Sequence, residues 1–406
     1  MADERPKLRT DLEFFPVQQG KERFVFIKDI LGLAEGKLLP FSLFEVMAQM
    51  DGKNSIRDLQ VFIMRKSGGM IISKHEVEDL VEKLDKMFLL DSDRYRKEKK
   101  KIEEEFLSQK IRPCSHCGKA YPKDPERLKE MIDKIVADGN SPDDNIIALI
   151  APHIDISVGS KVYGKVYREI RDTKFSKVII LGVGHYMSDN LFCLTEKDFE
   201  IPLGIIKTDK EAIRMLKKAA PEIISNTDFA HKSEHSIEFQ LIFLRHLIKT
   251  DFEIIPILCG PVRLFLDSYE RATYINKVRP FIEILSNIFS QEQTLLVAGV
   301  DLSHIGPKFG HDMPARYLES QAKAHDSALI DALLNKSPER FWEESKRVDD
   351  KYNVCGFSAI CCFLELIIKC SIPATIKAEL LDYEMWFEEA TNSAVSFCGM
   401  KFLGDF

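Results

Sequence analysis

Histidine and aspartate residues follow three short apolar segments, each of which is typical of a buried β-strand. The segment IIALIAPH ends at His153, and KVIILGVGH ends at His185. A third segment, TLLVAGVDLSH, contains Asp301 and ends at His304. In an open α/β sheet, ligands bind outside the carboxyl ends of the strands. Imidazole and carboxylate groups delivered there from separate strands predict one shared crevice that holds a metal site or an acid–base site.

Taken singly, each of these residues also has a purely structural interpretation. A loop histidine such as His153 can satisfy a backbone group, and an aspartate such as Asp301 can cap a helix. The position of these residues favours a functional role over a structural one, because His153 and His185 follow the two strands of one βαβ unit. Asp301 stands three residues before His304, where a carboxylate can orient an imidazole.

Two further candidates lie at the start of predicted helices. His235, in SEHSIE, precedes a helix expected over 236–248, and helix amino ends favour anions and polar ligands. Cys355, in VCGFSAI, precedes a helix expected over 357–369. A helix amino end stabilises a thiolate, so Cys355 is a candidate soft metal ligand or nucleophile. The single C-x-x-C at Cys114 and Cys117 lacks the second pair of a zinc site.

The elements that must position these residues alternate as strand and helix from about residue 112 onward, which predicts an α/β domain over 112–406. Asp124 and Pro125 have the types expected at the start of a helix. The expected strands lie at 146–151, 177–183, 253–258, 294–300, 375–383 and 393–402. The expected helices lie at 157–171, 236–248, 267–289, 319–334 and 357–369.

Residues 1–92 have a different pattern, with short amphipathic helices and Ser55 as a predicted N-cap. We interpret FLLDSDRY, at 88–95, as a short strand. Three helices followed by a strand resemble a winged helix, which could bind DNA, a peptide or another domain. A docking role is favoured over DNA binding because this region is not basic overall. The charge run RYRKEKKKIEEE marks residues 93–111 as a helical linker.

The composition is that of a globular protein, with 45% hydrophobic and 30% charged residues among 406 and a net charge of −7. The negative charge argues against broad nucleic-acid binding, because phosphate contacts require a basic face. The segment MADERPKLRTDLEFF lacks the apolar core of a signal peptide, and the longest apolar stretch is interrupted by Glu365. We therefore expect a cytoplasmic protein without a membrane span, whose nine cysteines are reduced thiols, with room for one or two functional ones, rather than a disulfide framework.

Six short motifs occur in one order along the chain: SHCGKAYPKDPERL, APHIDISVGS, LGVGHY, SEHSIE, VDLSHIG and VCGFSAI. Together they resemble the Memo family, in particular the AmmeMemoRadiSam system protein B branch, over about 112–404. The resemblance implies a fold similar to that of class III extradiol dioxygenases. We thus expect a central, mixed, largely parallel sheet with helices on both faces, preceded by the winged-helix-like module.

The resemblance also implies a metal site. His153, His185 and Cys355 match the positions of metal ligands in the family. Two imidazoles and a thiolate suit Zn, Cu or Fe better than Mg or Ca, and family precedent favours iron or copper with redox chemistry.

The remaining candidates match positions beside the metal. Asp301 and His304 correspond to a polar pair next to it, and His235 corresponds to a histidine of the same pocket. These three are the expected acid–base residues. The position of Cys117 usually holds a small residue in the family, so we interpret the C-x-x-C as incidental.

The chain also departs from the family pattern. It has PHIDIS where PHAGY is common, which removes an aromatic residue and adds Asp155. A thiolate replaces the glutamate of the ring-cleaving enzymes, so dioxygenase activity does not follow from the fold. We expect metal-dependent redox chemistry on a small molecule or a peptide. The alternative is a binding or adaptor protein, and the branch name implies radical SAM and AMMECR-type partner proteins.

Overall fold

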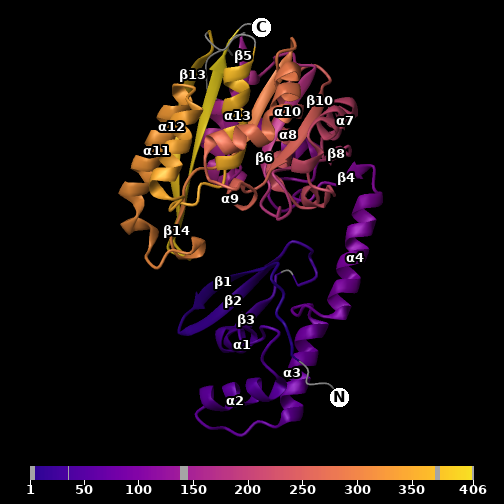
Figure 1. Cartoon of the computed structure of the whole chain (residues 1–406), viewed down its shortest axis with the longest axis vertical. Helices are drawn as coiled ribbons and strands as arrows, with labels where there is room; N and C mark the ends of the chain where they lie inside the picture. The colour runs from indigo at the N-terminus through magenta and orange to yellow at the C-terminus, as the bar shows by residue number, and fades with distance from the viewer. Residues whose placement is uncertain (1–4, 35, 138–144, 371–374, 405–406) are drawn as a thin grey trace. The chain divides into compact units, whose positions relative to one another are not determined.

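The computed structural model describes residues 5–34, 36–137, 145–370 and 375–404 (Figure 1). The chain divides into two compact units, residues 1–108 and 109–406. None of the helices in the described ranges combines the length and the apolar character needed to cross a bilayer.

The first unit begins with a three-stranded antiparallel sheet, which the sequence pattern did not predict. Its strands, in the order β1-β2-β3, are β1 (Leu12–Gln19), β2 (Glu22–Asp29) and β3 (Leu38–Pro40). Four helices follow: α1 (Phe41–Met47), α2 (Ile56–Lys66), α3 (Lys74–Lys86) and α4 (Asp93–Ser108). The predicted N-cap at Ser55 is confirmed, because its side chain accepts a hydrogen bond from the Asp58 backbone N–H.

The strand expected at 88–95 is wrong. Phe88 has a φ of +58°, which strands do not adopt. Only Leu90 forms an isolated bridge, to Leu8. Helix α4 already begins at Asp93 and continues through the charge run.

The second unit is built on a mixed sheet of eleven strands. Their order is β12-β14-β5-β11-β6-β10-β9-β8-β4, with β13 paired to β14 and β7 paired to β10. The bounds are β4 (Ile111–Arg112), β5 (Ile146–Ala151), β6 (Lys177–Val183), β7 (Phe192–Leu194), β8 (Asp198–Ile201), β9 (Gly204–Thr208), β10 (Glu253–Cys259), β11 (Thr294–Gly299), β12 (His304–Ile305), β13 (Lys377–Glu388) and β14 (Ser393–Leu403). Strands β5, β11, β6 and β10 run parallel, and β14 is antiparallel to β5.

Helices pack on both faces of this sheet. On one face lie α5 (Pro125–Ile135), α6 (Ile156–Tyr167) and α8 (His235–Leu247), and on the other lie α7 (Lys210–Ala219), α10 (Arg271–Phe289) and α13 (Phe357–Lys369). Further helices are α9 (Val262–Phe265), α11 (Glu319–Leu334) and α12 (Pro338–Val348). Side chains of β6 alternate between the two cores, with Val178 and Ile180 on the α8 side and Ile179 and Leu181 on the α13 side.

The parallel register brings the ends of three strands to one edge of the sheet. Gly299, the last residue of β11, pairs with Ala151 of β5 on one side and with Gly182 of β6 on the other. The residues that follow these strands therefore emerge next to one another. The loops so aligned are those that carry His153, His185 and Asp301.

Candidate metal centre

Three imidazole rings meet at this edge of the sheet. The ring centroids of His153 and His185 are 5.0 Å apart, and His235 lies 5.2 Å from the first and 5.0 Å from the second. His235 is the first residue of α8, as the sequence predicted for a residue at a helix start. Neighbouring strand ends and one helix end thus bring the three rings together.

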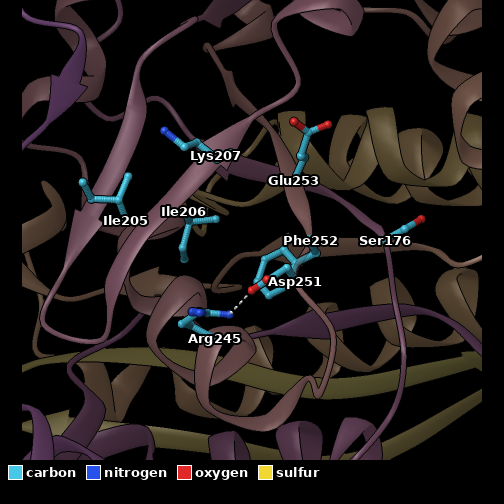
Figure 2. A pocket seen from close by; sticks show the side chains of 8 residues that line it. All are labelled: Ser176, Ile205, Ile206, Lys207, Arg245, Asp251, Phe252 and Glu253. Atoms are coloured by element: carbon cyan, nitrogen blue, oxygen red, sulfur yellow. Dashed lines mark hydrogen bonds and ion pairs between the residues drawn. The ribbon is translucent and has the colours of Figure 1, made fainter.

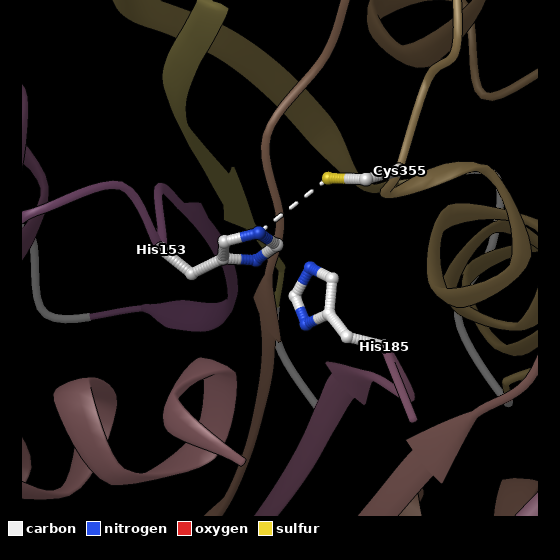
Figure 3. A group of neighbouring side chains, drawn as sticks. All are labelled: His153, His185 and Cys355. Carbon is white, nitrogen blue, oxygen red and sulfur yellow. Dashed lines mark hydrogen bonds between the residues drawn. The ribbon is translucent and has the colours of Figure 1, made fainter. Parts of the chain in front are cut away.

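Cys355 brings a sulfur atom to the same place from the segment before α13. Its Sγ lies 3.4 Å from Nε2 of His153. His153, His185 and Cys355 each offer one ligand atom within 4.8 Å of the others, and Figure 3 shows these side chains pointing toward one another. Gly356 makes this approach possible, since a Cβ there would lie 2.7 Å from the Asp301 carbonyl oxygen.

His153 is held so that one ring nitrogen faces the pocket. Its Nδ1 lies 2.9 Å from the carbonyl oxygen of Gly299. Because a carbonyl only accepts hydrogen bonds, Nδ1 must carry the proton, which leaves the Nε2 lone pair toward Cys355. Burial, opposed in part by the charge of Asp301, holds the pKa of His153 below 6.5. The ring is therefore neutral at pH 7, as a metal ligand requires.

Glu234 orients His185 in a corresponding way. Nδ1 of His185 lies 3.0 Å from Oε1 of this buried glutamate. Glu234 is also the N-cap of α8, where it accepts the backbone N–H groups of His235 and Ser236. Burial alone would raise the pKa of Glu234, but His185 and the other donors hold it well below 4.5.

Asp301 lies beside two of the candidate ligands and is almost fully buried, at 1% exposure. Its Oδ1 accepts the backbone N–H of His153 at 3.0 Å, and its Oδ2 lies 3.7 Å from Nε2 of the same ring. Its carbonyl oxygen lies 3.6 Å from Sγ of Cys355. One residue thus contacts both His153 and Cys355.

His304 lies in the short strand β12, two residues beyond Leu302, whose carbonyl oxygen is 3.0 Å from its Nδ1. Burial, with small contributions from His153 and His185, lowers the pKa of His304 to about 4 despite the nearby Asp301. The ring is therefore neutral at pH 7.

The helix start does not lower the pKa of Cys355 in the absence of a cation. Burial, and then the charge of Asp301, raise the pKa of this thiol well above 9. Without a metal ion, these two effects favour the thiol form of Cys355 over the thiolate expected from the sequence. A bound metal ion would oppose both effects, because thiols coordinate as thiolates.

Two residues of the site have no counterpart in the sequence-based candidates. Glu234 reaches His185 from a helix cap, and His116 places its ring 5.7 Å from that of His235. Glu234 could have been noticed as an acid directly before a candidate histidine. Nothing in the sequence indicates that His116, which lies within the C-x-x-C, is close to His235.

A separate pocket of about 340 Å³ lies at the opposite ends of the strands (Figure 2). Its lining includes Ser176, just before β6, and Glu253, the first residue of β10. Arg245 and Asp251 form an ion pair there at 3.1 Å. None of the predicted site residues lines this pocket.

The donor set fits a transition metal. Two imidazole nitrogens and one sulfur are ligands for Fe, Cu or Zn, whereas Mg and Ca prefer oxygen. His153 is buried, Cys355 is half-buried and His185 is exposed, so one side of the cluster is open to solvent. Both imidazoles have their second nitrogen hydrogen-bonded, which is the usual arrangement for histidine ligands.

Comparison with known proteins shows the family of this chain. A family model described as Memo-like protein matches residues 112–401. A MEMO1 family protein of Aquifex aeolicus is 31% identical over 398 residues, covering 98% of this chain and 100% of the relative. MEMO1 family proteins of Thermus thermophilus and Nitrosopumilus maritimus are 25% and 26% identical, covering 71% and 72% of this chain and 83% and 100% of the relatives. The chain belongs to the Memo family.

Proposed function

We propose that the second unit is a mononuclear metal protein that carries out redox chemistry on a small molecule or a peptide. The observation that carries the proposal is the convergence of His153, His185 and Cys355, whose ligand atoms lie within 4.8 Å of one another. Iron or copper is the metal proposed, with zinc as the redox-inactive alternative. Bound there, iron or copper would supply one-electron transfer to a substrate or to dioxygen.

The chain's own residues supply orientation and proton transfer. Glu234 fixes the ring of His185, and the Gly299 carbonyl fixes that of His153. The neutral His235 ring, 5.0 Å from His185, can accept a proton from a substrate that enters the open side. We assign the Asp301 carboxylate and His304 the same role on the buried side of the pocket.

Metal analysis of anaerobically purified full-length protein tests the proposal. We expect about one Fe or Cu per chain, in line with the ligand softness of the site, and its loss when His153→Ala is combined with Cys355→Ala. His246→Ala is the matched control, because His246 pairs with Asp133 away from the pocket. An unchanged metal content in the double variant would contradict the assignment.

A second candidate function is that of an adaptor in a protein-modification system. The first unit favours this function because it has its own hydrophobic core around Ile27, Met47 and Leu59, as a separate docking module would. The Aquifex aeolicus relative aligns over nearly the whole chain, first unit included. On this view the first unit is a winged-helix-like docking module, and the chain belongs to the AmmeMemoRadiSam system protein B branch, with an extradiol-dioxygenase-like second unit and a cytoplasmic location.

Sedimentation velocity of the full chain mixed with a radical SAM or an AMMECR-type protein tests the adaptor function. A complex that forms equally with wild-type chain and with the metal-ligand double variant supports it. Absence of any complex, with metal retained by the wild type, favours the redox protein.

A further inference from the structure

Cys114 and Cys117 form a disulfide on the segment that follows β4, with their Cα atoms 5.9 Å apart. The other seven cysteines are outside any disulfide, as expected, and six of them are buried. The expectation of reduced thiols therefore fails for this pair. Both residues are half-buried, and the adjacent Pro113 and Gly118 are exposed, so the pair lies at the surface of the second unit.

This disulfide closes a very small loop, because its cysteines are only three residues apart. The stabilisation given by a disulfide grows with the length of the loop that it closes. A pair so close in sequence adds little to the stability of a large α/β unit. Stability alone therefore does not account for it.

The carboxylate of Glu238, on α8, organises the segment around the two sulfur atoms. It accepts the backbone N–H groups of Ser115 at 3.1 Å and His116 at 2.8 Å, and it pairs with the buried Arg112. Sγ of Cys114 lies 3.7 Å from its Oε1. Burial opposes ionisation, but Arg112 and the other donors lower the pKa of Glu238 to about 2, so it is a permanent hydrogen-bond acceptor at pH 7.

The same helix end connects this segment to the metal pocket. Glu238 stands one helical turn after Glu234 and three residues after His235 on α8. The His116 ring, between the two cysteines, lies 5.7 Å from the His235 ring, and its Nε2 lies 3.1 Å from the Ser233 carbonyl oxygen. A displacement of residues 114–117 thus acts directly on the surroundings of His235.

We propose that Cys114 and Cys117 are a redox-active dithiol/disulfide site whose reductant is a dithiol and whose state is transmitted to the pocket through Glu238 and His116. A thiolate of the reductant attacks one sulfur, the S–S bond breaks, and the other cysteine leaves as a thiolate. The second thiol of the reductant then resolves the mixed disulfide. Two electrons and two protons pass to the pair, and the reductant becomes a disulfide.

Reduction changes the hydrogen bonding at Glu238. The disulfide sulfur of Cys114 has no proton to donate, whereas its thiol has one and lies 3.7 Å from Oε1 and 3.3 Å from the Tyr121 hydroxyl. Oε1 already accepts from the His116 backbone and from the Tyr121 hydroxyl. The new donor competes with the His116 N–H, so the two redox states hold His116 differently beside His235.

A redox titration of the metal-free full chain tests the first part of the proposal. The protein is equilibrated with mixtures of reduced and oxidised dithiothreitol, alkylated, and digested with trypsin, which releases both cysteines in the peptide 111–119. We expect this peptide to pass from two alkyl groups to none at a finite ratio of the two reagents. A pair that stays fully oxidised in reduced dithiothreitol, or fully reduced in oxidised dithiothreitol, overturns the proposal.

Histidine NMR of the same metal-free protein tests the connection to the pocket. Ring resonances of His116 and His235, assigned with His116→Gln and His235→Gln, should shift on reduction in the wild type. They should not shift in a Cys114→Ser/Cys117→Ser variant, and Cys370→Ala should behave as the wild type. If reduction leaves both resonances in place, the connection is wrong. Neither test depends on whether the pocket binds iron or copper.

Discussion

Nδ1 of His185 lies 3.0 Å from Oε1 of Glu234, a buried carboxylate from a different part of the chain. Because a carboxylate only accepts hydrogen bonds, this contact places the proton on Nδ1 and makes Nε2 the nitrogen whose lone pair can bind a metal. Such carboxylate–histidine pairs orient the ligand and raise its basicity. Glu234 also caps α8, so one side chain fixes both His185 and the helix that carries His235.

The first prediction concerns this carboxylate. Glu234→Gln keeps an oxygen that can cap α8 but removes the charge that faces His185. We expect the affinity for the metal to fall by about 10–100-fold, measured by competition with a chromophoric chelator. Glu211→Gln, at an exposed position in the first turn of α7, is the matched control and should bind as the wild type. Equal affinities for all three proteins would show that Glu234 does not support the ligand.

The second prediction concerns the tautomer of His153. The hydrogen bond to the Gly299 carbonyl requires that Nδ1 carry the proton. In ¹⁵N-labelled metal-free protein at pH 7, the Nε2 resonance of His153 should have the chemical shift of an unprotonated nitrogen. Adding metal should broaden or move this resonance before that of Nδ1. A protonated Nε2 at neutral pH would contradict the proposed direction of the lone pair.

The third prediction concerns the packing that holds β11 against α8. A Cβ added at Gly299 would lie 2.4 Å from the Ser236 carbonyl oxygen and 2.7 Å from Nε2 of Gln240. Gly299→Ala should therefore destabilise the chain by about 1–3 kcal/mol, measured by urea unfolding. Because the Gly299 carbonyl accepts from His153, metal affinity should fall as well. An unchanged unfolding midpoint would show that β11 and α8 leave room for a methyl group at residue 299.

The fourth prediction concerns the pH dependence of stability. The folded state lowers the pKa of Glu238 from 4.5 to about 2, so the unfolded chain binds more protons between these values. The stability that Glu238 contributes is complete above pH 4.5 and is lost as the pH falls toward 2. The shift corresponds to about 3 kcal/mol at pH 7.

Glu238→Gln is the test of that fourth prediction. It should unfold about 3 kcal/mol more easily than the wild type at pH 7, because it leaves the Arg112 charge unpaired in the core. The difference between the two proteins should shrink as the pH falls from 4.5 toward 2. If the difference in unfolding free energy does not change over this pH range, the loss of stability comes from altered packing rather than from the missing charge.

The centre of the second unit could be predicted from the sequence because its strands are buried on both sides. Strands β5, β6 and β11 consist almost wholly of buried apolar residues. Such apolar runs, bounded by loops, strongly indicate buried strands in a sequence. Helices α11 and α13 begin and end at the predicted residues. The predicted N-cap at Asp124 is confirmed, since its side chain accepts the Arg127 backbone N–H.

The sheet of the first unit could not be predicted in the same way. Strand β1 contains Pro16, which favours an edge strand or no strand. Only one face of β2 is buried, at Val25, Ile27 and Asp29. Charged residues at both ends of that strand hide its alternation. The remaining sign of a hairpin in the sequence was Gly20, which forms the turn between the two strands with a φ of +62°.

The site was predictable where it depends on strand ends and not where it depends on packing between distant segments. His153 and His185 follow parallel strands, so their meeting follows from topology. Glu238 contacts Ser115 across 123 positions of sequence. No periodicity or spacing connects two such residues, and only the folded chain brings them together.

Nε2 of His153 and Sγ of Cys355 lie 3.4 Å apart in the cluster but belong to residues 202 positions apart. During synthesis, a ribosome that has completed β11 has released both histidines but not yet the sulfur. The full set of donors exists only after α13 has emerged and packed against the sheet. If the cluster binds a metal as proposed, capture of the ion follows the folding of this last segment, and an unfinished or unfolded chain lacks the arrangement needed to retain it.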